Sequence, residues 1–429
     1  MRHPPIALAL LTLAAAVPSV AAQQPVVIEG TTVVSPHLGA PITGASVFIR
    51  DGRIEAVAPA DELDVAPEIQ RIDGRGKWVI PGLVEYHTHN RGAAALSRAL
   101  ALGVTLAQII SGSGSPIEVE ERSHLADEPS PRIVLLTGRI GQFVGAPTPM
   151  SPEAAAAQVR QMRSSGVRTI KVWHDDGLLW FSPENAFPAV PEPALRTLVR
   201  EAHELGMEVA AHAWKLNLFR MALDAEVDRL IHPVGDSTVP DAIWARMRER
   251  EMAWTTTMSP LLTYADVEEY TRRVMADPRL IAGYSDATLA NLVDPDFARG
   301  RYERYPIMRQ NRELYLQTVA ANTRNALANR VNVVVGSDAT LGVGTHIEIE
   351  LMAEAGMTPE QILRAATTNG ASALGFGAWL GTVEVGKTAD LVILNSDPLE
   401  DVRNLRDTFL ILKGGHVFEP REVRQAGGG

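Results

Sequence analysis

The middle of the chain alternates between short apolar runs typical of β-strands and amphipathic stretches typical of helices. Helical periodicity is clearest over 152–165 and 193–205. The candidate strands, eight in number, span 78–85, 104–109, 132–137, 169–173, 208–213, 229–232, 253–258 and 332–337. Strands that alternate with helices favour a parallel α/β sheet, and a set of eight favours a closed, distorted (β/α)8 TIM barrel over an open sheet.

The two ends of the chain carry β-structure of a different kind. Between residues 23 and 77, short β-branched runs surround Asp51-Gly52, a strong signal for a two-residue hairpin. Glycine turns separate further strand-like runs at 381–383, 389–394 and 409–418. We therefore expect one small β-sandwich domain built from residues 23–77 and 379–426. The barrel would span 78–378, with residues 259–330, which lack an obvious strand, as a helical insertion.

The first 22 residues have the pattern of a secretory signal peptide. Arg2 and His3 precede an apolar run over 6–17, and small residues follow at 18–22. A retained membrane anchor is the alternative, but the run is well short of the ~20 apolar residues that span a bilayer. We expect cleavage after Ala21 or Ala22 and a periplasmic or secreted protein, without stable membrane insertion.

Composition excludes several classes of function. The chain has no cysteine, which rules out disulfides, thiolate metal sites and a thiol nucleophile. Its net charge is −11, and acidic and basic residues are interspersed without a Lys/Arg-rich run. Nothing therefore points to nucleic acid as a partner, and a small-molecule substrate is expected.

Polar side chains able to bind metals stand at the ends of five candidate strands. His87 and His89 follow the first strand, where positions i and i+2 project to one face. Such a pair alone is a weak signal. The same place on four later strands is taken by Lys171, His212, His232 and Asp338. Because barrel active sites are built at the C-terminal strand ends, this recurrence predicts a metal-dependent active site.

The chemistry of these residues is consistent with two divalent ions. Histidine and carboxylate ligands without thiolate suit Zn²⁺, with Mn²⁺, Co²⁺ or Fe²⁺ as alternatives. Lys171 is the odd member, because an ammonium would be repelled by divalent cations. Burial beside cations lowers the pKa of the amine, and a neutral amine can take up carbon dioxide. The product, N6-carboxylysine, is an anionic ligand that could bridge the two metals.

The sequence resembles the amidohydrolase superfamily, metal-dependent hydrolases that combine a distorted (β/α)8 barrel with a small β-sandwich from both termini. The resemblance extends over essentially all of the chain after the signal peptide. It rests on the segment 78–89, on Lys171, His212, His232 and Gly336-Ser337-Asp338, and on the block 381–392. One departure is Glu85, where the family usually places Asp two residues before the first histidine.

The resemblance also implies a role for each residue. His87 and His89 would bind the more buried metal together with Asp338, and His212 and His232 would bind the second. Carbamylated Lys171 would bridge both. Asp338 would take the proton from a bridging water and pass it to the leaving group. The lysine after strand four is similar to the binuclear prolidase-like and imidazolonepropionase-like branch.

The expected reaction is hydrolysis of an amide bond in a dipeptide or an N-acyl amino acid. A cyclic-amide, lactone or ester hydrolase on the same metal centre is the alternative, and an inactive binding protein that retains the fold is a third possibility. The complete ligand set argues against the third. Candidate substrate-binding residues are Arg139, Tyr264 and Trp214, although Arg139 could be a surface charge and Tyr264 a packing residue. Because relatives often assemble, a homo-oligomer is expected.

Overall fold

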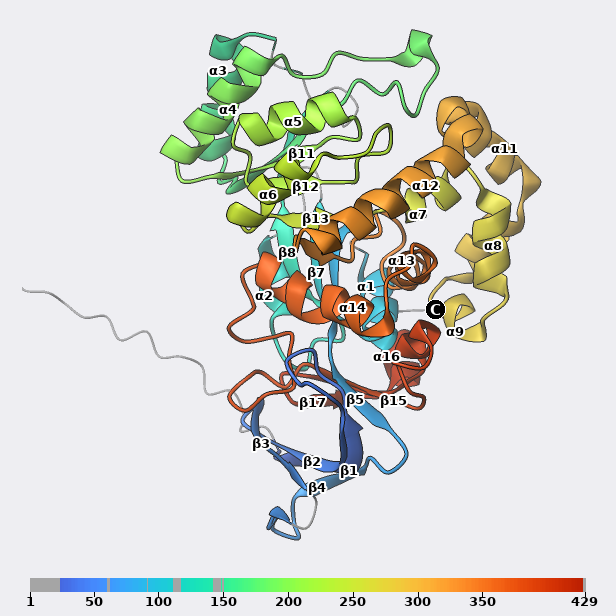
Figure 1. The fold of residues 1–429 in the computed structure, drawn as a ribbon. Coiled ribbons are helices and arrows are strands. Elements are labelled where there is room, and N and C mark those ends of the chain that lie inside the picture. The colour runs from blue at the N-terminus through green and yellow to red at the C-terminus, as the bar shows by residue number, and fades with distance from the viewer. Residues whose placement is uncertain are drawn as a thin grey trace, which may run out of the picture.

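The computed structural model describes residues 24–59, 62–90, 92–110, 117–141, 148 and 150–426. The predicted signal peptide lies outside these residues. Within them, no helix combines the length and the apolar character needed to cross a bilayer. Figure 1 shows a β-domain at one end of the molecule and, joined to it, a larger part in which helices surround parallel strands.

The larger part is a distorted barrel. Its strands are β6 (Leu83–Thr88), β7 (Val104–Ile110), β8 (Arg132–Leu136) with its continuation β9 (Gly138–Ile140), β10 (Thr169–Trp173), β11 (Glu208–His212), β12 (Arg229–Ile231), β13 (Ala253–Thr255) and β14 (Asn332–Val334). They form three parallel ladders, β6–β7–β8, β9–β10–β11–β12 and β13–β14. Tyr86 N–H donates to the Val335 carbonyl (2.8 Å), which joins the last strand to the first. The predicted fold class is confirmed.

Helices cover the outside of the barrel. They are α1 (Ala93–Ala101), α2 (Ile117–Ser123), α3 (Pro152–Ser164), α4 (Glu192–Glu204), α5 (Leu216–Asp224), α6 (Asp241–Glu249), α13 (Val343–Glu354), α14 (Pro359–Arg364), a π-helical turn η4 (Ala365–Asn369) and α15 (Gly370–Ala373). α4 shows why they form. Its buried residues Leu195, Leu198 and Ala202 recur at helical spacing, so one face packs into the barrel core while the other stays polar.

Both termini build one eight-stranded sheet. Its strands are β1 (Val26–Val33), β2 (Ile42–Arg50), β3 (Arg53–Pro59), β4 (Gln70–Asp73), β5 (Trp78–Pro81), β15 (Leu391–Leu394), β16 (Thr408–Lys413) and β17 (His416–Phe418). Side-chain alternation gives the sheet two apolar faces. Val79 and Leu391 face the core of the β-domain, whereas Ile80 and Val392 pack into the core of the barrel.

Two strand predictions need correction. The run 78–85 is two strands, because β5 pairs with β1 and β15 in the terminal sheet and only β6 enters the barrel. The change of sheet occurs at Gly82, where a Cβ atom would lie 2.0 Å from the Thr105 hydroxyl oxygen. Residues 381–383 do not form a strand, although Val383 is buried in the core of the β-domain. The hairpin at Asp51-Gly52 is present, with φ of +50° and +74°.

The helices between β13 and β14 are α7 (Ser259–Thr263), α8 (Val267–Met275), α9 (Pro278–Ile281), α10 (Asp286–Val293), α11 (Pro295–Arg304) and α12 (Pro306–Ala328). Four of them, α8 to α11, begin at a cap residue whose side chain accepts a hydrogen bond from a backbone N–H of the helix. These cap residues are Asp266, Asp277, Ser285 and Asp294. A 3₁₀ turn η5 (Val402–Arg406) lies between β15 and β16, and α16 (Pro420–Ala426) follows β17.

Candidate metal centre

Lys171 is the middle residue of β10 and not, as predicted, its last. The other predicted ligands stand near or just beyond strand ends, where the backbone is unusual. His212 is the last residue of β11, His232 follows β12 directly, and Asp338 follows β14. His232, Thr257 and Asp338 have φ of +81°, +30° and +47°. Left-handed backbone costs a non-glycine residue about 1–3 kcal/mol and persists where the surroundings over-determine it, as in active sites. Three such residues therefore mark this end of the barrel.

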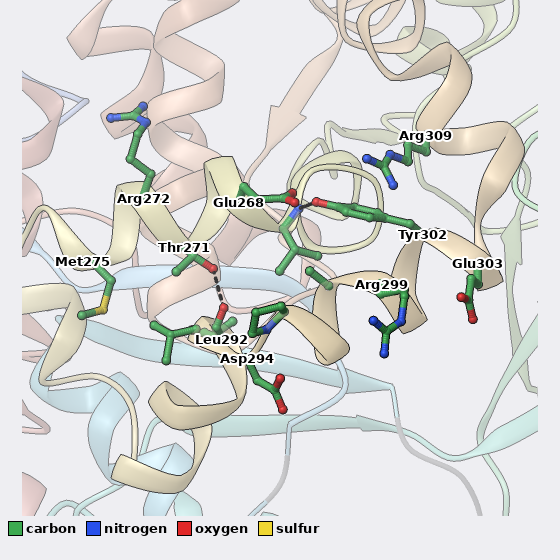
Figure 2. A pocket seen from close by; sticks show the side chains of 14 residues that line it. Glu268, Thr271, Arg272, Met275, Leu292, Asp294, Arg299, Tyr302, Glu303 and Arg309 are labelled. Carbon is green, nitrogen blue, oxygen red and sulfur yellow. Dashed lines mark hydrogen bonds between the residues drawn. The ribbon is translucent and has the colours of Figure 1, made fainter.

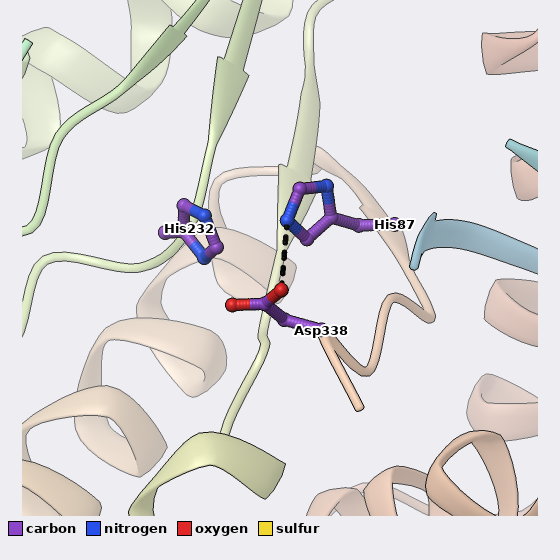
Figure 3. A group of neighbouring side chains, drawn as sticks. All are labelled: His87, His232 and Asp338. Carbon is purple, nitrogen blue, oxygen red and sulfur yellow. Dashed lines mark ion pairs between the residues drawn. The ribbon is translucent and has the colours of Figure 1, made fainter. Parts of the chain in front are cut away.

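Figure 3 shows His87, His232 and Asp338 converging on one point. One ligand atom from each lies within 4.8 Å of those of the other two. Asp338 Oδ1 is 3.4 Å from His87 Nε2 and 3.1 Å from His89 Nε2. These contacts bring together side chains that lie at or beyond the ends of β6, β12 and β14.

The remaining predicted ligands join the same cluster. The ring centroid of His232 lies 4.2 Å from that of His212 and 4.6 Å from that of His87. Lys171 is 3% exposed, and its charge lowers the pKa values of His87, His212 and His232. His89 differs from the others in that its side chain is 53% exposed, on the open side of the cluster. All six predicted residues are therefore neighbours.

Several buried polar atoms in this cluster lack a hydrogen-bond partner among the described residues. They are both ring nitrogens of His87, both ring nitrogens of His212 and the Lys171 amine nitrogen. Leaving such an atom unsatisfied costs about 1–3 kcal/mol, so most buried polar atoms have partners. Orphaned imidazole nitrogens beside a carboxylate are the donor set that a divalent cation would satisfy. The residues present thus fit a metal site.

The electrostatics put each group in its metal-binding form. Burial lowers the pKa of His87 to about 3, and Lys171 adds to the effect. The pKa values of His212 and His232 also fall well below normal, mainly through burial, so the imidazoles are neutral. Burial alone would raise the pKa of Asp338, but His87 and His89 outweigh it and keep the carboxyl ionised. Burial lowers the pKa of Lys171 to about 7.

Two buried glutamates hold the loops that carry these ligands. Glu85 accepts hydrogen bonds from His87 N–H (2.9 Å), Ser337 N–H (2.8 Å) and the Thr345 hydroxyl (2.8 Å). It therefore ties β6 to the residue before Asp338 and to α13. Glu85, which stands where the family usually has Asp, thus has a hydrogen-bond donor for each of its two carboxylate oxygens.

Glu348, which the sequence analysis did not single out, plays the same part after β13. Its carboxylate accepts hydrogen bonds from the Thr256 hydroxyl (2.6 Å), Met258 N–H (2.9 Å) and Ser259 N–H (2.7 Å). These bonds fix the turn at Thr257, whose hydroxyl lies 3.1 Å from His232 Nδ1. No sequence signal separates Glu348 from an ordinary helical glutamate.

The three predicted substrate residues lie at different distances from the cluster. Trp214 is fully buried, with its ring 6.1 Å from that of His232. Tyr264 stacks on Tyr305 at 4.8 Å; burial raises its pKa, and the charge of Asp338 adds to the rise. Arg139, in β9, pairs in register with Lys171. His346 of α13 is directed elsewhere, with Nε2 at 2.8 Å from the Leu102 carbonyl, so it joins α13 to the end of α1.

A separate cavity lies away from this cluster. It has a volume of about 910 Å³ and lies in the insertion, between α8, the end of α10 and α11 (Figure 2). Its lining mixes apolar residues such as Val267 with Arg272 and Glu303, and no predicted ligand contributes. The convergent, unpartnered ligand atoms at the strand ends, and not this cavity, have the arrangement of groups that metal-dependent catalysis requires.

Comparisons with known proteins agree with this geometry. Residues 78–415 match the model of the Amidohydrolase family. The chain is 25% identical over 396 residues to the imidazolonepropionase of Symbiobacterium thermophilum, covering 83% of this chain and 84% of that protein. A solved structure from Bifidobacterium longum, assigned as a prolidase, matches with a TM-score of 0.72 and 25% identity, covering 95% of this chain and 99% of that one.

A second solved structure, the ochratoxinase of Aspergillus niger, has the same fold, with a TM-score of 0.68 and 19% identity over 92% of this chain and 96% of that one. The predicted superfamily, with its prolidase- and imidazolonepropionase-like branch, is confirmed. The protein is a hydrolase that acts on carbon–nitrogen bonds, and it belongs to the amidohydrolase family.

Proposed function

We propose that this protein hydrolyses an amide bond in a dipeptide or an N-acyl amino acid, using two divalent metal ions. The observation that carries the proposal is the set of buried, unpartnered nitrogens around Asp338. His87, His89 and Asp338 would hold one ion, His212 and His232 the other, and Lys171 would contact both. Ions bound there, with zinc as our first choice, would lower the pKa of a water molecule and polarise the scissile carbonyl.

Asp338 is the residue suited to move the proton. Its carboxylate faces two histidine nitrogens at 3.1 and 3.4 Å and stays ionised, so it can accept a proton from the attacking water. An amide nitrogen is a poor leaving group unless it is protonated. Asp338 would then return the proton to that nitrogen as the C–N bond breaks.

Lys171 supports the metals only in a modified form. Its neutral amine would add to the carbon of carbon dioxide, forming an N–C bond and releasing one amine proton, which leaves an anionic carbamate. Asp338 is the single carboxylate among the six predicted ligands, so two dications would otherwise be poorly balanced. A carbamate on Lys171 would supply a second anion to the site.

Aromatic side chains beside the histidines support a substrate with an apolar group near the scissile bond. Trp180 packs 5.0 Å from Trp214 and 6.3 Å from Tyr264, measured between ring centroids. Arg301 lies 5.0 Å above the Tyr264 ring, so a cationic group stands beside this aromatic wall. Arg139 and Tyr264 remain our candidates to hold a substrate carboxylate or polarise its carbonyl.

One observation favours a second candidate. The relative from Symbiobacterium thermophilum, similar over 396 residues, is named for an imidazolone substrate. Hydrolysis of a cyclic amide, or of a lactone or ester, would use the same ligands.

We further propose that residues 1–22 direct export to the periplasm or medium and that the mature protein is a homo-oligomer. N-terminal sequencing of the exported protein and light scattering test these two proposals.

The function is tested by a hydrolysis screen of the metal-loaded protein against dipeptides, N-acyl amino acids, cyclic amides and lactones. We expect amide substrates to be cleaved, and Asp338→Asn to lower kcat by about 10²–10⁴-fold. Activity confined to lactones would remove the peptidase proposal. Unchanged hydrolysis by Asp338→Asn would remove the proposed mechanism.

A further inference from the structure

We infer that Asp175 is a positioning residue that holds His212 with its Nε2 toward a carboxylate and its Nδ1 toward the metal. The inference rests on the proposed function, because it concerns how one ligand is presented. Asp175 follows β10, four residues after Lys171, and is 0% exposed. Its Oδ2 atom lies 3.7 Å from His212 Nε2, within the buried interior.

The carboxylate itself is rigidly placed. Oδ2 also accepts a hydrogen bond from Trp214 N–H at 2.9 Å, and Oδ1 accepts one from Gly177 N–H at 3.0 Å. The acceptor atoms are thus fixed between the ends of β10 and β11. A shift of about 1 Å by the ring would turn the 3.7 Å contact into a hydrogen bond donated by Nε2.

The ring of His212 has little freedom to turn elsewhere. Trp173 stacks on it at 3.6 Å with an interplanar angle of 22°, and the His232 ring lies edge-on at 4.2 Å. A neutral imidazole carries one N–H and one lone pair. With the N–H directed at Asp175, the lone pair is left on Nδ1, so the carboxylate sets the tautomer as well as the orientation.

Two other histidines, His232 and His89, direct Nδ1 rather than Nε2 at an oxygen outside the predicted ligand set. His232 uses Nδ1 for the Thr257 hydroxyl at 3.1 Å, and His89 uses Nδ1 for the Ile110 carbonyl at 2.5 Å. Both therefore offer Nε2 to a metal. The Nε2 atoms of His87 and His89 face Asp338, which is itself a predicted ligand, whereas Nε2 of His212 faces Asp175, a carboxylate outside the predicted set. His212 is therefore the histidine that would bind through Nδ1.

The neighbouring residue provides a matched control. Asp176 accepts a hydrogen bond from Leu178 N–H through Oδ1 (3.1 Å), as Asp175 does from Gly177. Its Oδ2 pairs with the Lys215 amine at 2.8 Å, away from the predicted ligands. A purely structural carboxylate in this loop should behave like Asp176.

The experiment compares Asp175→Asn with Asp176→Asn in the full-length mature protein. Stepwise zinc affinities are measured by competition with a chromophoric chelator, and the melting temperature of the metal-free form reports folding. We expect Asp175→Asn to weaken one of two zinc sites by about 10–100-fold, as for other partners of metal-binding histidines. Asp176→Asn should leave both affinities unchanged. Equal zinc affinities in wild type and Asp175→Asn would overturn the inference.

A measurement on the wild type keeps the test independent of how the variant folds. In zinc-loaded protein with ¹⁵N-labelled histidine, we expect the His212 signal, assigned with His212→Gln, to show metal on Nδ1 and a proton on Nε2. A proton on Nδ1 of His212 would overturn the inference. Fewer than two bound zinc ions in the wild type would instead contradict the proposed function, so the two failures are distinguishable.

Discussion

Burial lowers the pKa of Lys171, so its amine can be neutral near pH 7. The contribution of Lys171 to activity can be tested separately from that of the histidines. We expect Lys171→Met to lose activity by more than about 100-fold, because loss of a ligand should exceed the 10–100-fold typical of a residue that only supports one. In Lys171→Ala, added acetate or propionate should restore part of kcat, because a small carboxylate can replace the carbamate. Activity of Lys171→Met within tenfold of wild type would contradict the bridging role.

Glu85 offers a test of positioning by a buried carboxylate. All three of its partners donate, so Glu85→Gln would set an amide N–H₂ group against a donor. We expect a loss of about 1–3 kcal/mol in the free energy of unfolding, measured with urea on the metal-free protein. Glu85→Asp keeps the charge, carries the residue usual in the family and should lose less. A Gln variant as stable as wild type would show that these bonds contribute nothing.

At this scale the sequence predicts which residues meet but not how they are oriented. His87, Lys171, His212, His232 and Asp338 could be identified because strand ends of a barrel share one face. The partnership of Asp175 with His212 depends on a ring orientation set by Trp173 stacking. A linear sequence contains no signal for that contact, nor for the left-handed backbone at Thr257.

At the scale of elements, local pattern identified strands but not the sheets they join. The run 78–84 is apolar throughout, because nearly all of its residues are buried whichever way they point. Hydrophobic alternation therefore could not show that β5 pairs with β15 while β6 pairs with β7. The break at Gly82 follows from close packing against Thr105, a contact between residues far apart in sequence.

The β16 strand carries a buried amine whose titration can be tested. Lys413 donates to the carbonyls of Glu128 and Ser130, both at 2.8 Å. Burial, with help from Arg132, lowers its pKa from 10.5 to about 8, against the opposing charge of Asp390. Two carbonyl acceptors also satisfy the two N–H groups of a neutral amine, so deprotonation breaks no hydrogen bond.

The sign of the resulting pH dependence follows from proton binding. Between pH 8 and 10.5 the unfolded chain holds more protons at Lys413, so the free energy of unfolding rises with pH. From pH 8 to 9.5, wild type should gain about 2 kcal/mol relative to Lys413→Met, since each pKa unit corresponds to about 1.4 kcal/mol. Urea unfolding of both proteins checks this. Parallel pH profiles for the two proteins would contradict a depressed pKa.

At the scale of the whole molecule, buried ion pairs join the parts that the sequence keeps apart. Arg132 of β8 pairs with Asp390 just before β15 at 2.7 Å, which links the barrel to the terminal sheet. Arg406 of η5 pairs with Asp277 of the insertion at 2.8 Å and with Glu350 of α13 at 2.5 Å. Removing one partner of such a pair leaves a buried charge, so these contacts fix the parts relative to one another.

The metal centre should contribute to the stability of this whole assembly. The proposed ligands come from β6, β10, β11, and the segments after β12 and β14, so ions bound there would cross-link most of the barrel. Without ions, the unpartnered nitrogens of His87, His212 and Lys171 remain buried. A ligand at 1,000 times its Kd stabilises a fold by about 4 kcal/mol, so chelation should lower the melting temperature and added zinc should restore it.

A matched variant separates specific binding from other effects of the chelator. In His232→Asn, which lacks a central ligand, chelation should change the melting temperature far less than in wild type. Lys413→Met changes a residue of β16, in the terminal sheet, and should respond as wild type does. If elemental analysis showed that wild type had lost its zinc while its melting temperature stayed unchanged, the ions would not hold the barrel strands together. The orphaned nitrogens would then have to be satisfied in another way.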